Sequence, residues 1–589
     1  MRGVELRCLV LRVGRSRSYS SFAFALPLCL FMDGDEVDER CRGCGDEFSE
    51  FWFENSVNQI AVPFFTSAAT KKPMPVPQLF KFRGMIQDMF HREIYVGAYQ
   101  ENAIWKKNNY NDFDVAPPRY GVAPTIAILD RTFYICIPVP GLNSWAEPAS
   151  DEAKWRQTCG AFQRDKRPRM ENEANVCNDI PVLSITMDSS IFAIDCMQCQ
   201  ILTQKLFPRL KRRGTRCLVK IYDTPESEFK LNDIYEFIGV LISRILEDFI
   251  GTCLEGGEHK RRRSMTVQFA TGSSLPQLHC GYHRTPSASE SLLMPFVGRP
   301  APSKPYLIKD VRESLLKHLT IVFGNDGVVS QLMLLHFISQ VHARVSNFIT
   351  GKFSLNLTFT NEEDILLFLP QLTSVIKKIL PFTGCIMLTT EYLNKCSLGP
   401  RHSLDQNRLL PGVLQLAGGS HMTIDISQLK SGMLTPCGFD NARFLADLIE
   451  FQKVRYDFIY YKKEMETDIQ LLILSDGNSR HLPVDAIIPF QPSSSIIIPE
   501  ASAKELEAWR WYLSTVRSLP HTIGPDIQRV VETDLVAASQ ANRNIGVQDF
   551  NRLMTMSRLM SASFGEKFLT LEHWQMTKEL ERQRMDRFK

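Results

Sequence analysis

The sequence lacks three features that would each indicate a function directly. No run of about 20 apolar residues occurs, so no membrane-spanning helix is expected. The 68 basic and 65 acidic residues leave a net charge of only +3, which does not favour general nucleic-acid binding. The phosphate-loop string G-x-x-x-x-G-K-[ST] is absent from the whole chain, which excludes the usual triphosphate cradle of nucleotide hydrolases.

Cysteine is present, but without the regular spacing of a disulfide framework. The chain has 15 cysteines, and free thiols in a reducing compartment are the simpler interpretation. Two Cys-x-x-Cys pairs, Cys41/Cys44 and Cys196/Cys199, could together supply four thiolates to zinc. Neither has a second pair close to it in the sequence. We therefore interpret both as coincidental and predict no metal site and no cofactor.

The N-terminal residues carry a mixed signal. Several arginines precede an apolar run over residues 22–32, which is typical of a signal or transit segment. No small-residue cleavage site follows, and Met32 stands directly before an acidic stretch that could be a protein start. We interpret residues 1–45 as a leader or as an upstream extension of the gene model. Residues 46–78 are treated as a short N-terminal segment.

Strand-like segments rich in β-branched and aromatic residues dominate the next part of the chain. They form two groups, separated by a polar, charged stretch over residues 146–214 that has no clean hydrophobic period. One domain interrupted by an inserted loop explains this better than two very small domains. We predict a split OB-like β-domain over residues 79–145 plus 215–283. Its alternating aromatic residues are expected mostly in the core: Phe80, Phe82, Phe133 and Tyr134.

The hydrophobic period changes after a linker rich in serine and proline at residues 284–305. Apolar residues then recur at i+4 from Leu307, and a second helix is predicted over residues 328–345. Strands and helices alternate beyond it, which indicates an α/β domain over residues 306–500. A helical domain is predicted over residues 501–589. The expected fold class is therefore mixed α and β multidomain.

Seven uncommon strings occur along the chain in a fixed order. They are residues 82–90 (FRGMIQDMF), 132–141 (TFYICIPVPG), 217–222 (CLVKIY), 231–234 (LNDI), 407–409 (NRL), 412–416 (GVLQL) and 452–458 (QKVRYDF). With these strings the chain resembles the mini-chromosome maintenance (MCM) complex-binding protein family. That family is nuclear and itself resembles the subunits of the MCM helicase. The resemblance implies a degenerate AAA+-like α/β domain with a C-terminal helical lid.

The resemblance also implies where the catalytic positions of an ATPase would stand. After the strand at residues 353–359, in place of a phosphate loop, the chain has Glu362, Glu363 and Asp364, which would repel a triphosphate. Asp425 stands where the metal-side acid is expected. The next residue, in place of the catalytic glutamate, is Ile426, which cannot act as a general base.

Two further positions differ in the same direction. Pro483 stands at the place of the arginine finger, and Gln548 at the place of the second sensor arginine. Phosphoryl transfer depends on charge neutralisation, a metal ion and a positioned water. A chain without the lysine, the glutamate and both arginines is expected to have no ATPase activity, and we predict that it is not an enzyme.

Basic clusters lie in the predicted loops, where a solvated surface is the ordinary interpretation. Because the family is nuclear, we expect at least one cluster to direct nuclear import. The candidate in the inserted loop consists of Arg164, Lys166, Arg167 and Arg169, and the others are residues 211–213 and 260–263. His279, His336 and His342 are isolated in the sequence, so we interpret His336 as a core or cap residue and predict no metal triad.

These observations together predict a non-catalytic regulator of DNA replication. By resemblance it would bind MCM helicase subunits as a subunit mimic and reach chromatin only indirectly. It would promote unloading of the complex late in S phase, or protect newly made subunits, and so support sister-chromatid cohesion. Two alternatives stay open: an AAA+-like ATPase with a cryptic nucleotide site, and a single-stranded DNA adaptor acting through the β-domain. Direct DNA binding and membrane association are not expected.

Overall fold

The computed structural model describes two parts of the chain. The first comprises residues 78–90, 92–101, 104–107, 126–146, 216–222, 224–242 and 275–286. The second comprises residues 306–588 without 346–347, 405–407, 430–431, 477–481, 493–498 and 542–545. Isolated positions near residues 62–65 and 290–292 are also described.

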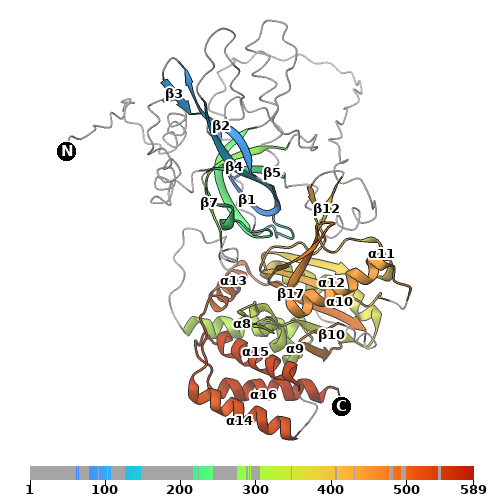
Figure 1. The fold of residues 1–589 in the computed structure, drawn as a ribbon. Helices are drawn as coiled ribbons and strands as arrows, with labels where there is room; N and C mark the ends of the chain where they lie inside the picture. Colours follow the sequence, from blue (N-terminus) through green and yellow to red (C-terminus); the bar gives the residue numbers. More distant parts are fainter. Residues whose placement is uncertain are drawn as a thin grey trace, which may run out of the picture.

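The first part folds into a seven-stranded sheet, five of whose strands close into a barrel (Figure 1). Strand β1 pairs with both β6 and β4, and the cycle β1-β6-β7-β5-β4 is therefore complete. Only β5 and β7 pair in parallel. The strands are β1 (Gln78–Met89), β2 (Glu93–Glu101), β3 (Ile104–Lys107), β4 (Ile126–Ile137), β5 (Cys217–Tyr222), β6 (Ile234–Ile242) and β7 (Gln277–Arg284).

Aromatic side chains fill the interior of the barrel. Phe80, Phe82 and Tyr134 belong to its main apolar cluster, and Phe133 is buried as well. The prediction that these aromatic residues lie in the core is confirmed. Since side chains alternate across a strand, burial of this set also fixes which face of β1 points inward.

The second part is built on a five-stranded parallel sheet. Its order is β11-β14-β17-β10-β18, and every neighbouring pair is parallel. Strands β10 and β14 are buried along their whole length, as is usual when helices cover both faces of a sheet. The strands are β10 (Leu355–Phe359), β11 (Thr383–Met387), β14 (Ser420–Asp425), β17 (Ile469–Asp476) and β18 (Ala486–Pro489).

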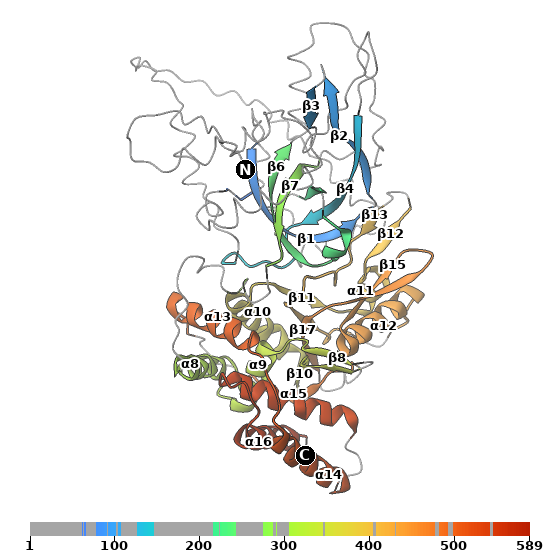
Figure 2. The same cartoon turned by 60° about the vertical axis from the view of Figure 1, so that its left-hand side comes forward.

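Helices cover the two faces of this sheet unequally. One face packs against α8 (Tyr306–Val322), α9 (Gly327–Ile338), α10 (Glu362–Ile379), α13 (Ala503–Arg517) and α15 (Val547–Ser563). The other face packs against α11 (Thr390–Lys395) and α12 (Pro436–Phe451). Helices α14 (Pro525–Ala541) and α16 (Leu571–Asp586) lie at the end of the molecule opposite the barrel (Figures 1 and 2).

A smaller sheet lies between the barrel and the parallel sheet. Its order is β13-β12-β15-β16, from β12 (Arg401–Ser403), β13 (Arg408–Leu410), β15 (Lys453–Asp457) and β16 (Lys462–Glu466). A short hairpin, β8 (Ala343–Val345) with β9 (Phe348–Thr350), follows α9. The predicted helix over residues 328–345 was too long. Helix α9 ends at Ile338 because Ser339 takes an extended conformation, with φ −62° and ψ 142°.

The mixed α and β class predicted from the sequence is confirmed by these sheets and helices. The domain boundaries predicted at residues 79–145, 215–283, 306–500 and 501–589 stay predictions.

Two buried histidines hold α9 against the parallel sheet. His336 Nδ1 donates to the Phe353 carbonyl at 2.8 Å, and its Nε2 lies 3.1 Å from Nε2 of His421 on β14. His336 is then a neutral acceptor at Nε2, and His421 is the donor. Burial lowers the pKa of His336 to about 4 and that of His421 well below its ordinary value. The interpretation of His336 as a core residue is confirmed.

This pair predicts a loss of stability in mild acid. Below pH 6.5 the unfolded chain takes up protons that the folded chain refuses, so the free energy of unfolding falls as the pH drops. The expected slope is about 1.4 kcal/mol per pH unit for each histidine. Urea unfolding between pH 7.5 and 5 measures it. The slope should be smaller in His336→Asn, which keeps a donor toward Phe353, and an unchanged slope would contradict the assignment.

Candidate functional site

The edge of the parallel sheet where a nucleotide would bind is closed by a very short connection. Strand β10 ends at Phe359 and α10 begins at Glu362, so only Thr360 and Asn361 join them. A phosphate loop places eight residues of its motif between such a strand and its helix, with glycines that let the backbone wrap the phosphates. Two residues cannot form that cradle.

The first turn of α10 is occupied by carboxylates of the chain itself. Glu362, Glu363 and Asp364 lie there, where the positive end of the helix dipole favours negative charge. Gln428, which follows β14, donates to Glu362 Oε2 at 3.1 Å. The helix end that could attract a bound anion is therefore already occupied by carboxylates of the chain. The hydrogen bond from Gln428 also fixes the loop after β14 to this end of α10.

The acid that the resemblance places on the metal side is sealed inside the protein. Asp425 is the last residue of β14 and is fully buried; its Oδ1 accepts the Ser427 N–H at 2.9 Å. Its Oδ2 has no hydrogen-bond partner within the described part of the chain. Ile426 is buried in the apolar cluster beneath α12, so its side chain contributes packing and no chemistry.

The other two ATPase positions lie away from Glu362 and Asp425. Pro483 lies three residues before β18 at the amino edge of the sheet, whereas Glu362 and Asp425 lie at the carboxyl edge. Gln548 is exposed in the first turn of α15, one turn before Arg552, which donates to the Asp485 carbonyl at 3.4 Å. The four positions thus form two separate groups and no single pocket.

Lys352, the one lysine that follows a glycine near β10, has a structural role. Its Nζ lies 2.8 and 2.9 Å from the two carboxylate oxygens of Asp485, at the amino edge of the sheet. Asp485 also accepts from the backbone and hydroxyl of Ser354, at 2.7 Å each. This lysine is therefore bound to a carboxylate at the edge opposite to a phosphate site.

Among the described residues, a metal centre would require a cluster of ligating side chains. Within these ranges no group of three or more His, Cys, Asp or Glu residues is placed to hold a metal ion. His279 contacts the Tyr222 hydroxyl at 2.5 Å and so belongs to the barrel core. No helix in the described part is long and apolar enough to cross a membrane.

Several sequence predictions lie outside the described residues. These are the leader at residues 1–45, both Cys-x-x-Cys pairs, the basic cluster Arg164, Lys166, Arg167 and Arg169, and the clusters at 211–213 and 260–263.

Buried hydrogen bonds join the barrel to the parallel-sheet part, and we call this contact the junction. Gln87 Nε2 donates to the Leu409 carbonyl at 2.8 Å, and the Leu409 N–H donates to Asp88 Oδ2 at 2.9 Å. The Tyr456 hydroxyl donates to Asn232 Oδ1 at 2.8 Å. Burial raises the pKa of Asp88 to about 6. The hydrogen bond from the Leu409 N–H stabilises the carboxylate and so acts in the opposite direction.

A second set of bonds closes the other side of the junction. The Thr383 N–H donates to the Gly141 carbonyl at 2.9 Å, and the Asn143 side-chain amide donates to the Leu380 carbonyl at 2.7 Å. Gly141 has φ +72°, and a Cβ there would lie 2.6 Å from the Thr383 carbonyl oxygen. Only glycine fits this approach without strain.

Comparison with known proteins places the chain in a family. Residues 48–588 match the family described as mini-chromosome maintenance replisome factor. The chain belongs to this family. It is 40% identical over 600 residues to the mini-chromosome maintenance complex-binding protein of Arabidopsis thaliana, covering all of both chains. Proteins of the same name from Salmo salar and Homo sapiens are 28% and 27% identical, over 86% and 91% of this chain and 88% and 93% of theirs.

The strings that suggested this family meet at the junction. Gln87 and Asp88 lie in the first string, Asn232 in the fourth, Leu409 in the fifth and Tyr456 in the last. Sequence reasoning did not identify the junction, because its strings lie up to about 370 residues apart and no local period links them. The signal was the two adjacent polar pairs, Gln-Asp within β1 and Asn-Asp directly before β6.

The closed edge predicts that charge removal alone will not restore nucleotide binding. In Glu362→Gln/Glu363→Gln/Asp364→Asn the repulsion is gone, but the two-residue connection still offers no cradle for phosphates. Equilibrium dialysis with labelled ATP and Mg²⁺ should detect no binding to the native chain or to the triple variant. The ATP concentration is 1 mM, taken as about the upper limit of ordinary substrate affinity. Micromolar binding by the native chain would show that the edge opens.

Proposed function

We propose that this protein is a non-catalytic partner of the MCM complex that binds MCM subunits as a subunit mimic. In this role it promotes unloading of the complex from chromatin late in S phase, or protects free subunits, and thereby supports sister-chromatid cohesion. The relatives that it matches over 93–100% of their length are named for binding the MCM complex. The observation that carries the non-catalytic part is the two-residue connection between β10 and α10.

The parallel sheet supports descent from an AAA+-like ATPase. Its order, β11-β14-β17-β10-β18, is the strand order of AAA+ cores, with β10 in the place of the phosphate-loop strand. Asp425 then ends the strand that would carry the metal-side acid. Fold likeness alone does not give a function. Here it explains how a chain without ATPase residues could present a helicase-like surface.

The barrel supports an OB-like assignment by its connectivity. In chain order its five strands are β1, β4, β5, β6 and β7, and their cyclic order joins the third strand to the fifth in parallel, as in OB folds. The hairpin of β2 and β3 is then an insertion between the first two strands. Along the chain, this OB-like barrel precedes the AAA+-like core.

Purification of the tagged full-length protein from nuclear extract tests this function. We expect recovery of MCM subunits, with the mass of the native complex corresponding to one copy of this chain in place of one subunit. Recovery should not change in the triple variant Glu362→Gln/Glu363→Gln/Asp364→Asn, because neither this variant nor the native chain is expected to bind ATP at this edge. Absence of MCM subunits from the purified material would reject the proposal.

The two alternative functions gain less support from the geometry. An ATPase would need phosphate contacts that the closed edge does not provide. A single-strand DNA adaptor would need exposed aromatic platforms, whereas Phe80, Phe82, Phe133 and Tyr134 are each less than 5% exposed. A strongly salt-dependent affinity for oligonucleotides would nevertheless favour the adaptor.

Nuclear localisation is part of the proposal, and the inserted loop supplies its test. Replacing Arg164, Lys166, Arg167 and Arg169 together with alanine should lower the nuclear fraction of a fluorescent fusion several-fold, because import signals are read through clustered positive charge. The matched control replaces residues 260–263, the other long basic run. Unchanged uptake in the first variant, with loss in the second, would move the signal to the control cluster.

A further inference from the structure

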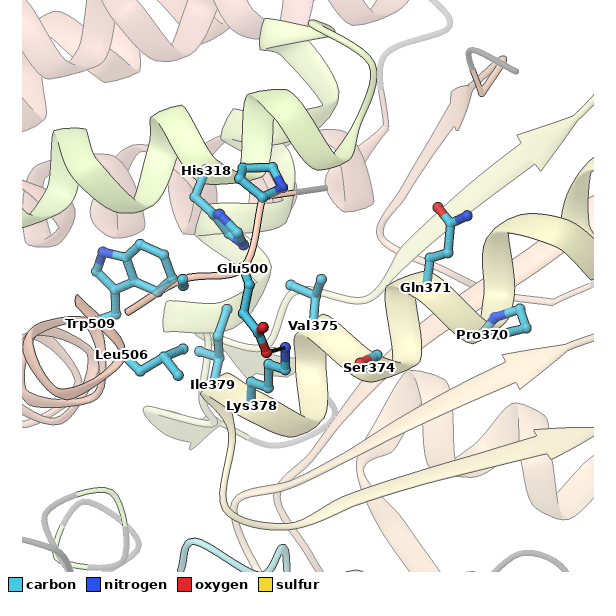
Figure 3. A pocket seen from close by; sticks show the side chains of 12 residues that line it. His318, Pro370, Gln371, Ser374, Val375, Lys378, Ile379, Glu500, Leu506 and Trp509 are labelled. Atoms are coloured by element: carbon cyan, nitrogen blue, oxygen red, sulfur yellow. Dashed lines mark hydrogen bonds and ion pairs between the residues drawn. The ribbon is translucent and has the colours of Figure 1, made fainter. Parts of the chain in front are cut away.

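Two adjoining cavities lie along the outer side of helix α10. Their volumes are about 540 and 490 Å³, and Pro370, Ser374 and Lys378 line both of them. Because they share these residues, we treat the two cavities as one site, which we call the α10 groove; Figure 3 shows its larger half. Each half lies within the size range of pockets that bind ligands or peptide side chains.

The groove is built where three parts of the fold meet. Trp145, from the segment after the barrel strand β4, donates from Nε1 to the Lys377 carbonyl at 2.7 Å. Arg510 of α13 stacks on the Trp145 ring at 3.6 Å and donates to the Lys378 carbonyl at 3.0 Å. These bonds satisfy the carbonyls at the end of α10 and hold the walls in place. A partner would thus meet a preformed site.

The floor of the larger half is apolar. Val375 and Ile379 of α10 face Leu506 and Trp509 of α13 across it (Figure 3). Trp509 is itself fixed, since its Nε1 donates to Ser314 Oγ at 3.2 Å. A bulky apolar side chain entering this space would bury its surface against aliphatic and aromatic neighbours, which is how anchor residues of interfaces obtain most of their binding free energy.

Lys377 supplies the exposed positive charge of the rim. Lys378 and Arg510 also lie there, but Glu500 and Glu507 offset their charges, and Glu500 is the one carboxylate among the described lining residues. Glu500 is bound to Lys378 at 3.1 Å. Lys377 makes no ion pair with any residue of the described part, and burial lowers the pKa of His318, which keeps it neutral. The charge of the rim is complementary to an acidic segment.

The apolar surface continues outward along α10. Leu366 and Leu367 are 48% and 72% exposed, one to two turns before the groove on the same helix. A chain lying along α10 would cover them and then place a side chain into the groove. This continuity favours an extended or helical segment of a protein over a small molecule.

We propose that the α10 groove binds a segment of an MCM subunit in which a bulky apolar side chain is flanked by acidic residues. This inference rests on the proposed function and adds the surface and the chemistry of the contact. The apolar side chain fills the space above Val375 and Trp509, and the carboxylates approach Lys377.

Photo-crosslinking with the full-length protein and purified MCM complex tests the contact directly. A photoreactive p-benzoylphenylalanine in place of Gln371, which lines the groove, should crosslink to one MCM segment with the predicted composition. The same residue in place of Arg529, exposed on α14, serves as the control and should not. Crosslinks to a segment without acidic residues, to a second copy of this chain, or to the chain itself would overturn the inference.

Affinity measurements with the same components give the second test. Lys377→Glu and Ser374→Trp should each weaken MCM binding about tenfold, the first by charge reversal and the second by filling the groove. The matched charge reversal Arg529→Glu should not. Equal thermal unfolding of all variants excludes a folding defect. If both groove variants bind the MCM complex with full affinity, the groove is not the binding site, but the proposed function is unaffected. If the native chain binds no MCM subunit, both the proposed function and the groove proposal are rejected.

Discussion

The buried junction is the contact on which the arrangement of this molecule depends. The Leu409 backbone is satisfied on one side by Gln87 and on the other by Asp88, so a single short segment is held by two side chains of the barrel. Loss of either partner would leave a buried polar group unpaired, which costs about 1–3 kcal/mol. Because both parts of the fold contribute to the same bonds, they cannot rotate against each other without breaking several at once. The position of Trp145 over α10, and with it the groove, follows from this constraint.

Much of the architecture could be predicted from the sequence because its signals are local. The alternating aromatics of the barrel and the i+4 spacing of α8 are set by neighbours within a few residues. The end of α9 could not be predicted, since its apolar residues surround the helix and the period carries no information about where it stops. The hairpin of β2 and β3 was also missed as an insertion, because the barrel that it leaves closes only through the long-range pairing of β1 with β4.

The candidate site could also be predicted only in part from the sequence. Missing ATPase residues can be found in a sequence because each has a defined type at a defined place. Whether the remaining residues share a pocket is a property of the fold. Glu362 and Asp425 lie at the carboxyl edge of the sheet, whereas Pro483 lies at the amino edge. The groove depends on Trp145, Lys377 and Arg510, which are more than 100 residues apart between any two, so no spacing pattern could have indicated it.

The short connection between β10 and α10 has a consequence for any assembly that contains this chain. In an ATP-driven ring each working subunit changes shape as its nucleotide is hydrolysed, and its contacts with neighbours strengthen and weaken in turn. A ligand shifts a conformational equilibrium only when it binds the two states differently. Thr360 and Asn361, which alone join β10 to α10, offer no phosphate cradle, so under the proposed function ATP and ADP would not select between states of this chain. Its own face of a shared contact would therefore keep one geometry throughout the cycle, as a fixed element among moving ones, regardless of the ratio of ATP to ADP in the cell.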